Sequence, residues 1–232
     1  MLVVSLIWTE EIERPGLYAL AQEIGSGRIT TLRYIMSFAI GGLFRQESVE
    51  ITLLYLEVRD WNKVYENIHE NNFLQARTMS TLKRVCSEIC SRLKTLNESE
   101  LEFLVNGTNQ EQNYLLWLAI CRRYHFIRDF AAEVIRERYL TLRPDLNYED
   151  FDAFFNAKAE WHYELEKIKD STRRKLRQVL FRMLREADLL TSSNTIIPAM
   201  LSPRFVSTVS RSAHQELLVF PAMESELKRR VQ

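Results

Sequence analysis

Cationic side chains concentrate in one stretch of this sequence, residues 170–188, which reads DSTRRKLRQVLFRMLREAD. Guanidinium and ammonium groups bind phosphate oxygens, so the chemistry that this stretch favours is recognition of a phosphate-bearing partner. At 100° per residue the stretch predicts one helix, and its apolar residues form a single arc that must face a core. The arc comprises Leu176, Val179, Leu180, Met183, Leu184 and Ala187.

The first turn of this predicted helix is basic, which is unusual for its position. Ser171 or Thr172 is expected as the N-cap, and three cations follow, although the helix macrodipole favours acids there by roughly 0.3–1 kcal/mol per charge. Because the N–H groups of a helix N-terminus also attract anions, we interpret this turn as a candidate phosphate site. The residues predicted to contact DNA are Arg173, Arg174, Lys175, Arg177, Gln178 and Arg182.

An acidic segment precedes the helix and leaves a second interpretation open. Glu160, Glu164, Glu166 and Asp170 lie within eleven residues of chain. If these carboxylates neutralise the first turn in the folded protein, then Arg173 to Arg177 are structural partners in ion pairs rather than DNA contacts.

A second basic face is predicted on a helix that Thr78 or Ser80 opens and that ends at Leu96. The window Arg77–Lys94 holds five cations against Glu88 alone. Short hydroxyls between cations allow a helix to approach phosphates closely, so we predict backbone contacts here, with a solvated helix face as the alternative. The residues are Lys83, Arg84, Ser87 and Lys94. With the preceding helix, residues 60–71, and the connector at 73–77, the order is that of a helix-turn-helix.

Other kinds of chemistry are disfavoured by the sequence. Six glycines leave little room for a phosphate-binding loop, and neither GxxxxGKS/T nor GxGxxG is present. Cys86 and Cys90 are spaced i, i+4 on an apolar stripe, which indicates buried thiols rather than metal ligands. His162 lies between two glutamates without a nearby nucleophile, so general acid–base catalysis is disfavoured. We expect no catalytic residues, no metal site, no cofactor and no enzyme activity.

The composition predicts a mainly α-helical fold. The 232 residues are 46% hydrophobic and 27% charged, with few glycines and only five prolines, and the formal net charge is zero. We expect a multi-helix bundle with helix-turn-helix elements. β-Branched residues flank a polar turn at residues 191–194, which predicts a small β-hairpin after the basic helix, the order of a winged helix-turn-helix.

The chain divides into four parts on its sequence pattern. These are a loosely attached leader at 1–33, a helical and helix-turn-helix part at 34–106, a helical part with a winged-helix-like end at 107–210, and a tail at 211–232. The helices expected at 108–123 and 125–142 carry the centre of the core, with Trp117. Three cysteines inside helical patterns indicate a reducing compartment, and no apolar run reaches the roughly 18 residues of a membrane helix. We therefore expect a cytoplasmic protein with no membrane partner.

Six segments carry a resemblance to a known family. Three are RERYLTLRPDLNYEDFDAFF at 136–155, DSTRRKLRQVLFRMLREADLL at 170–190 and P-x-x-LSPRF at 198–205. Three lie upstream: FAIGGLFRQES at 38–48, DWNKVYENIHENNFLQARTMSTLKR at 60–84 and LLWLAICRRYHFIRDF at 115–130. Together they resemble, in matching order from about residue 34 to residue 205, the BrxA family of BREX phage-exclusion proteins.

The resemblance implies a small helical protein with helix-turn-helix elements that binds double-stranded DNA. It implies a place in a phage-defence system that also contains a DNA methyltransferase, an ATPase and a phosphatase-like component, and it supplies no catalytic residues. Some members carry an inner-membrane label, which the apolar pattern of this chain does not support. We therefore predict a non-enzymatic DNA-binding component that acts with other BREX components. The alternatives are an adaptor whose basic helix docks an acidic partner, and binding of structured RNA.

Overall fold

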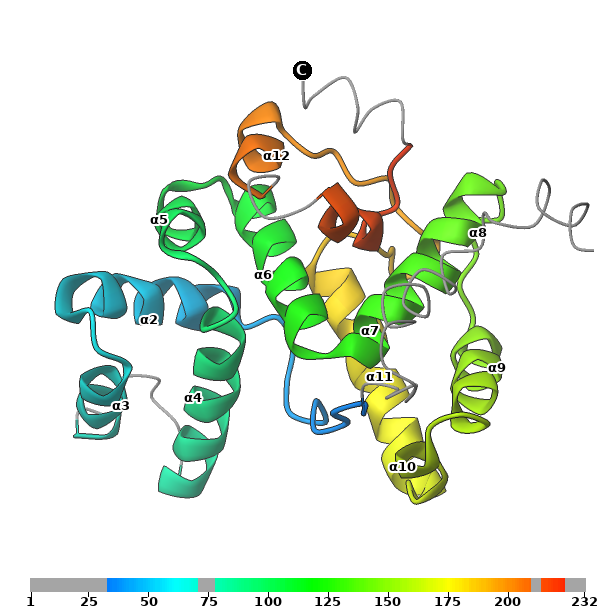
Figure 1. The fold of residues 1–232 in the computed structure, drawn as a ribbon, viewed down its shortest axis with the longest axis horizontal. Coiled ribbons are helices and arrows are strands. Elements are labelled where there is room, and N and C mark those ends of the chain that lie inside the picture. The colour runs from blue at the N-terminus through cyan, green and yellow to red at the C-terminus, as the bar shows by residue number, and fades with distance from the viewer. Residues whose placement is uncertain (1–32, 71–77, 210–213, 224–232) are drawn as a thin grey trace, which may run out of the picture. The chain divides into compact units, whose positions relative to one another are not determined.

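The computed structural model describes residues 33–70, 78–209 and 214–223, and in these ranges the protein is mainly helical (Figure 1). The first helices are α2 (Arg45–Val58), α3 (Trp61–Glu70), α4 (Met79–Leu93), α5 (Glu98–Asn106) and α6 (Asn109–Arg123). A continuous helical run follows, made of α7 (His125–Phe130), the π-helical turn η1 (Ala131–Arg136) and α8 (Glu137–Leu140). The later elements are α9 (Tyr148–Ala159), α10 (Tyr163–Glu166), α11 (Asp170–Glu186), α12 (Pro203–Val209) and the 3-10 turn η2 (His214–Val219).

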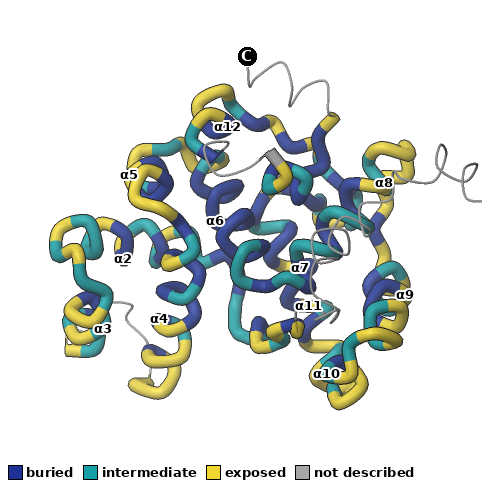
Figure 2. Tube along the Cα trace, viewed as in Figure 1, coloured by how far each residue is buried: buried dark blue, intermediate teal, exposed yellow. Residues whose placement is uncertain are grey.

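Helix α6 lies at the centre of the core. Every residue from Gln112 to Cys121 is buried, as expected of a helix that other elements surround (Figure 2). Trp117 is fully buried, and its indole N–H donates to the carbonyl of Val219 at 3.1 Å. The elements that pack on α6 are α2, α4, α5, α7, α11 and η2. The prediction that this helix and Trp117 form the centre of the core is confirmed.

Capping residues fix several helix starts, including the start that the sequence predicts at Thr78. The Thr78 hydroxyl accepts a hydrogen bond from the first turn of α4. Asn97 and Thr108 form capping boxes at the starts of α5 and α6. The Ser202 hydroxyl accepts from the first turn of α12, with Pro203 as the first residue of that helix. Local signals therefore place these boundaries within a residue or two.

The buried face of α2 differs from the apolar stripe of its sequence. Leu53 belongs to that stripe, yet 45% of it is exposed. The buried residues are Ser48, Ile51 and Thr52. The Thr52 hydroxyl donates to the carbonyl of Ser48 at 2.7 Å, which satisfies its polarity inside the helix. Ser48 and Thr52 are thus buried, although hydrophobicity alone predicts that Leu53 is buried in their place.

The β-hairpin predicted around residues 191–194 is not supported, since no strand forms in the described ranges. Isolated bridges pair Leu190 with Ile196 and Asp145 with Thr195. Leu190 and Ile196 are only 3% and 4% exposed, so the segment turns its apolar side chains into the core. A wing must project from the body to reach DNA, whereas burial of these side chains keeps this segment against the body.

Three predictions fall wholly or mostly outside the described residues: the leader at 1–33, the connector at 73–77 and the tail at 211–232. The described residues from Tyr34 onward belong to one compact unit, and the predicted division near residue 106 stays a prediction. Helices α3 and α4 pack against each other and against α2. In the part of the chain that the structure describes, no helix is long and apolar enough to cross a membrane.

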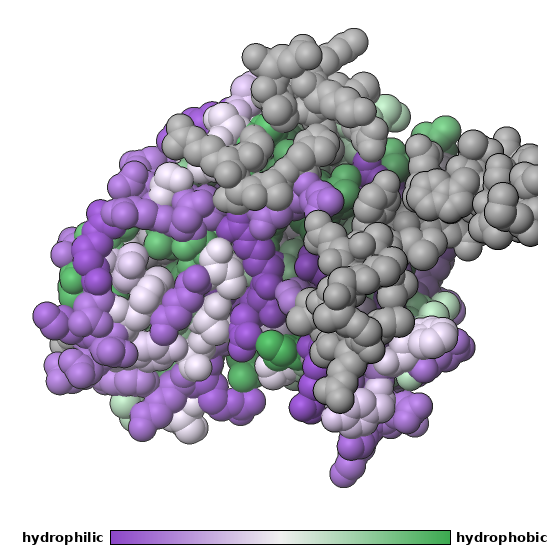
Figure 3. All heavy atoms as spheres, viewed as in Figure 1, coloured by the Kyte–Doolittle hydropathy of each residue, from purple (hydrophilic) through white to green (hydrophobic). Residues whose placement is uncertain are grey.

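The surface in view is mostly hydrophilic where α2 to α5 lie, with hydrophobic side chains scattered between polar ones (Figure 3). The strongest exposure of a large apolar side chain among the described residues is Leu142 at 80%, followed by Trp161 at 76%. Single exposed apolar residues are normal on a folded domain. The charged features of the surface are therefore the stronger candidates for a binding site.

Candidate nucleic-acid interface

Helix α11 forms as predicted and buries the predicted apolar arc. All six arc residues are at most 3% exposed, and the neighbouring Phe181 is buried with them. The N-cap, however, is Lys169, which makes no capping bond with its side chain, so the cap predicted at Ser171 or Thr172 is wrong. Asp170 therefore lies in the first turn, where its carboxylate suits the macrodipole.

Two of the predicted DNA contacts, Arg173 and Arg177, are used within the fold. The Arg173 Nε donates to the Asp152 carboxylate and its Nη2 to the Asp152 carbonyl, each at 2.9 Å. Arg177 pairs with the other carboxylate oxygen of Asp152. The two guanidinium groups also lie 4.5 Å from the ring centroids of Phe155 and Tyr148, respectively. These contacts clamp α11 onto α9, which favours the structural interpretation, with Asp152 rather than the 160–170 segment as the acidic partner.

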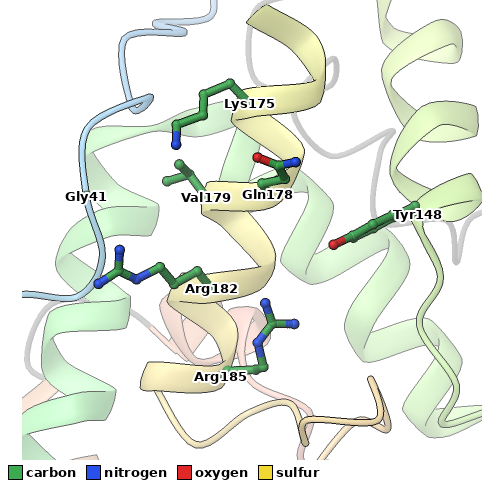
Figure 4. Close-up of a pocket in the computed structure, with 7 residues that line it drawn as sticks. All are labelled: Gly41, Tyr148, Lys175, Gln178, Val179, Arg182 and Arg185. Carbon is green, nitrogen blue, oxygen red and sulfur yellow. The ribbon is translucent and has the colours of Figure 1, made fainter. Parts of the chain in front are cut away.

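Four other polar residues of α11 line a cleft of about 360 Å³. Figure 4 shows the cleft with the α11 side chains between Gly41 on one side and Tyr148, from the start of α9, on the other. The α11 residues in its lining are Lys175, Gln178, Val179, Arg182 and Arg185. From residue 175 to residue 185 the helix axis rises about 15 Å. Three cations and no acid line the cleft, so it is a cationic site.

Hydrogen bonds hold two of these cations in place. The Arg182 Nε donates to Oε1 of Glu186 at 2.6 Å. Arg185 donates to the side-chain oxygen of Asn194 at 3.0 Å. The second oxygen of Glu186 accepts the N–H of Leu43, which ties this end of α11 to the loop before α2. The cations at the C-terminal half of the cleft are therefore partly preorganised.

Arg174, Lys175 and Gln178 are exposed. Neither Arg174 nor Lys175 makes an ion pair with a residue in the described ranges. Arg185 was not among the predicted contacts, although its i, i+3 spacing from Arg182 places it on the same stripe. The cleft thus unites three predicted residues, Lys175, Gln178 and Arg182, with one that the sequence analysis left out.

The second predicted set lies on and just after α4. Its exposed helical members are Lys83, Arg84 and Ser87. Lys94 follows the helix, and its ammonium lies 5.6 Å and 5.4 Å from the ring centroids of Trp61 and Tyr65, which holds it against α3. No α4 residue lines the cleft, and α6 packs against both α4 and α11. The structure therefore keeps the two sets on separate helices.

A buried ion pair that the sequence analysis missed anchors α4. The Arg92 Nε donates to Glu88 at 2.8 Å, and both residues are at least 92% buried. Tyr124 donates to the same carboxylate at 2.6 Å, and Arg92 also donates to the carbonyl of Gly42 at 2.8 Å. Burial, with the Glu88 charge, raises the pKa of Tyr124, so its hydroxyl stays a donor. The i, i+4 spacing of Glu88 and Arg92 was the available signal.

The residues weighed for catalysis and metal binding have structural contacts. His162 stacks on Tyr34 with 4.0 Å between ring centroids, and its Nδ1 lies 3.1 Å from Glu164. Glu164 also accepts the N–H of Tyr34 at 2.7 Å, so this group anchors the chain at residue 34. Cys86 and Cys90 are buried with 3.9 Å between their sulfurs. In the described ranges, no three His, Cys, Asp or Glu side chains lie together in a way that could hold a metal ion.

The fold and the site together define a mainly α-helical protein with a cationic cleft along its basic helix. The chain belongs to the BrxA family, whose model matches residues 32–213.

Comparison with individual proteins agrees with this assignment. The chain is 28% identical over 189 residues to a "BREX protein BrxA" of Escherichia coli O9:H4, an alignment that covers 82% of this chain and 81% of that protein. It is also 28% identical over 163 residues to a protein of the same name from Paramagnetospirillum magneticum, covering 70% of this chain and 82% of the relative. The crystal structure of an uncharacterized protein from Magnetospirillum magneticum superimposes with a TM-score of 0.72 at 22% identity, covering 82% of this chain and 98% of that one, which shows a shared fold.

Proposed function

We propose that this protein is a non-enzymatic, double-stranded DNA-binding component of a BREX-type phage-defence system and that the α11 cleft binds the DNA. Family membership supports the place in the system, because the relatives are named as BREX proteins. The observation that carries the DNA assignment is the line of three cations, Lys175, Arg182 and Arg185, in a cleft that no acid lines. Such a line matches a row of backbone phosphates.

The shape of the cleft favours backbone contacts over base contacts. A recognition helix must project to enter the major groove, whereas α11 lies between Gly41 and Tyr148 (Figure 4). A phosphate backbone can enter such a cleft. The three cations are spread along about 15 Å of helix, so each of them can contact a different phosphate of one strand. We expect binding with weak sequence selectivity and strong salt dependence.

A salt series tests this proposal. Duplex binding is measured for the wild type and for Lys175→Gln/Arg182→Gln/Arg185→Gln. Each phosphate contact contributes about 0.9 to the slope of log K against log salt concentration, so the triple variant is expected to lose up to about 2.7 units of slope together with affinity.

The matched control removes the same charge elsewhere. Arg59, Lys63 and Arg204 are exposed and lie after α2, on α3 and on α12, so Arg59→Gln/Lys63→Gln/Arg204→Gln is expected to keep most of the wild-type slope. Unchanged affinity and slope in the α11 variant would overturn the assignment of the cleft. Equal losses in both variants would indicate attraction by overall charge rather than binding at a site.

The size of the cleft also favours a second candidate, an adaptor that docks an acidic partner. About 360 Å³ lies within the range of small-ligand pockets, and carboxylates fit cationic clefts as phosphates do. Protein that fails to retain duplex DNA at about 50 mM salt but co-purifies with another BREX component would favour the adaptor. Competition between RNA and DNA duplexes decides whether structured RNA is the preferred nucleic acid.

A further inference from the structure

Glu186 is an acidic residue in direct contact with the cationic cleft. One carboxylate oxygen accepts the Nε–H of Arg182 at 2.6 Å, and the other accepts the N–H of Leu43. A Cβ added at Gly42 would lie 2.1 Å from Oε2 of Glu186, so the carboxylate and the loop are in close contact and a larger residue there requires the carboxylate to move. Both oxygens of Glu186 are therefore occupied by groups that border the site.

The contact between Glu186 and Arg182 uses one edge of the guanidinium. Only Nε donates to Glu186, and neither terminal nitrogen makes a hydrogen bond within the described residues. The guanidinium is a rigid plane, so fixing Nε also fixes the direction of the four terminal N–H bonds. A carboxylate that merely neutralised Arg182 would be expected to take the terminal nitrogens in a bidentate pair. The observed arrangement leaves those nitrogens available to an anion.

The peptide group between Gly42 and Leu43 extends the effect of Glu186 to the side of the cleft. Its N–H donates to Glu186 of α11, and its carbonyl accepts from the buried Arg92 of α4 at 2.8 Å. An anion on one side and a cation on the other fix the plane of this peptide. The preceding residue, Gly41, has φ +97° and lines the cleft. Glu186 thus helps to place both Arg182 and the Gly41 side of the cleft.

We infer that Glu186 is a positioning residue for phosphate binding, whose carboxylate increases the affinity of the cleft for a polyanion. This inference rests on the proposed DNA-binding function. Simple electrostatics predicts the opposite, because removal of an acid beside a cationic cleft raises its positive potential. The direction in which DNA affinity changes when Glu186 is replaced therefore distinguishes positioning from simple electrostatic attraction.

The test compares Glu186→Gln with Glu98→Gln. Glu98 lies on α5 and also pairs with an arginine, Arg59, so the control makes the same change of charge and releases an arginine in the same way. We expect Glu186→Gln to weaken duplex binding roughly tenfold, the loss of one charge-assisted hydrogen bond, and to lower the salt slope by about 0.9. Glu98→Gln is expected to leave both unchanged. Equal or tighter binding by Glu186→Gln overturns the inference.

A double-mutant cycle with Arg182→Gln separates positioning from general loosening of the fold. If Glu186 acts through Arg182, then Glu186→Gln adds little further loss once Arg182 is removed. Fully additive losses overturn the inference. Gly42→Ala displaces the carboxylate without changing any charge, so it is expected to weaken binding in the same direction, with denaturation midpoints showing that each variant is folded.

The inference can fail separately from the proposed function. If the wild type binds no duplex, the proposed function fails, and the Nε–H resonance of Arg182 in the NMR spectrum still reports on Glu186. This resonance is expected to be protected from exchange in the wild type and in Glu98→Gln, and to lose its protection in Glu186→Gln. A resonance that the Glu186 substitution leaves unchanged overturns the inference.

Discussion

Asp152 binds two arginines of α11 at once, through its carboxylate and its backbone carbonyl. Asp152→Asn removes the charge from both pairs, so we expect it to lower the free energy of unfolding by about 1.5–3 kcal/mol, the range for hydrogen bonds to charged groups. Glu160→Gln makes the same change of charge at an exposed site at the other end of α9. It is expected to change the free energy of unfolding by less than about 0.5 kcal/mol. Urea denaturation measures both, and equal effects would show that the clamp does not stabilise the fold.

His125 makes stability depend on pH below neutrality. Burial, together with the Arg128 charge, lowers the pKa of His125 below its ordinary value of 6.5. Below that value the unfolded chain binds a proton before the folded protein does, so the free energy of unfolding falls as the pH is lowered from about 7 to about 5. His125→Gln removes this proton uptake and is expected to flatten that part of the pH profile, measured by urea denaturation. A variant profile as steep as that of the wild type would contradict the assignment.

At the residue scale, the sequence predicted which residues are basic but not which of them are paired. Arg173 and Arg177 are separated by four residues and so lie on one side of α11, away from the stripe that holds Lys175 and Arg182. The helical wheel shows that separation. It does not show Asp152, which lies 21 residues before Arg173 and meets it only because α9 and α11 pack together. Pairing across helices is a property of packing.

At the element scale, α4 depends on the buried pair of Glu88 and Arg92. Removal of one partner of a buried pair leaves an uncompensated charge, so Arg92→Met is expected to cost about 3–5 kcal/mol of unfolding free energy. Arg59→Met removes an arginine from an exposed pair with Glu98 and is expected to cost at most about 1 kcal/mol. Guanidinium chloride denaturation compares the two variants. Similar costs would mean that Arg92 contributes to α4 mainly through its hydrophobic stem.

The same scale shows which elements the sequence can predict. Helices α6 and α11 form within two residues of their expected bounds, and α4 begins at its predicted cap but ends three residues before Leu96. The segment at 189–197 does not form the expected hairpin, because Leu189, Leu190 and Ile196 are buried against the body and the segment makes only isolated bridges. β-Branched residues on both sides of a turn indicate burial in an extended conformation, and they do not distinguish a projecting wing from a packed loop.

At the scale of the whole molecule, the helical class follows from composition, but the relative placement of the basic faces does not. Helix α6 separates them in the packing, since it contacts both α4 and α11. Helix α6 can lie between them because its residues from Gln112 to Cys121 are buried on every side. The polar residues near the start of the helix hide this burial from an analysis of the sequence. Clusters of charge in sequence therefore predicted two basic helices and overstated how many of their cations reach solvent.

The two basic faces lie on separate helices, so we expect the α4 face to contribute to DNA binding only when the duplex is long enough to reach beyond the cleft. Lys83→Gln/Arg84→Gln is expected to lower the salt slope by up to about 1.8 units on a duplex of about three helical turns, one contribution of about 0.9 for each contact. On a duplex of about 10 bp, a single turn, the same variant is expected to lose less slope, because a shorter duplex offers fewer phosphates to the α4 face.

Combination with the α11 substitutions completes this prediction. If both faces bind one long duplex through independent phosphate contacts, the slope losses of the α4 and α11 variants add in the combined variant. If the α4 double variant keeps the wild-type slope on the long duplex, then Lys83 and Arg84 belong to a solvated helix face. DNA binding would then belong to α11 alone, which makes Glu186 and the cleft that it borders the decisive part of the molecule.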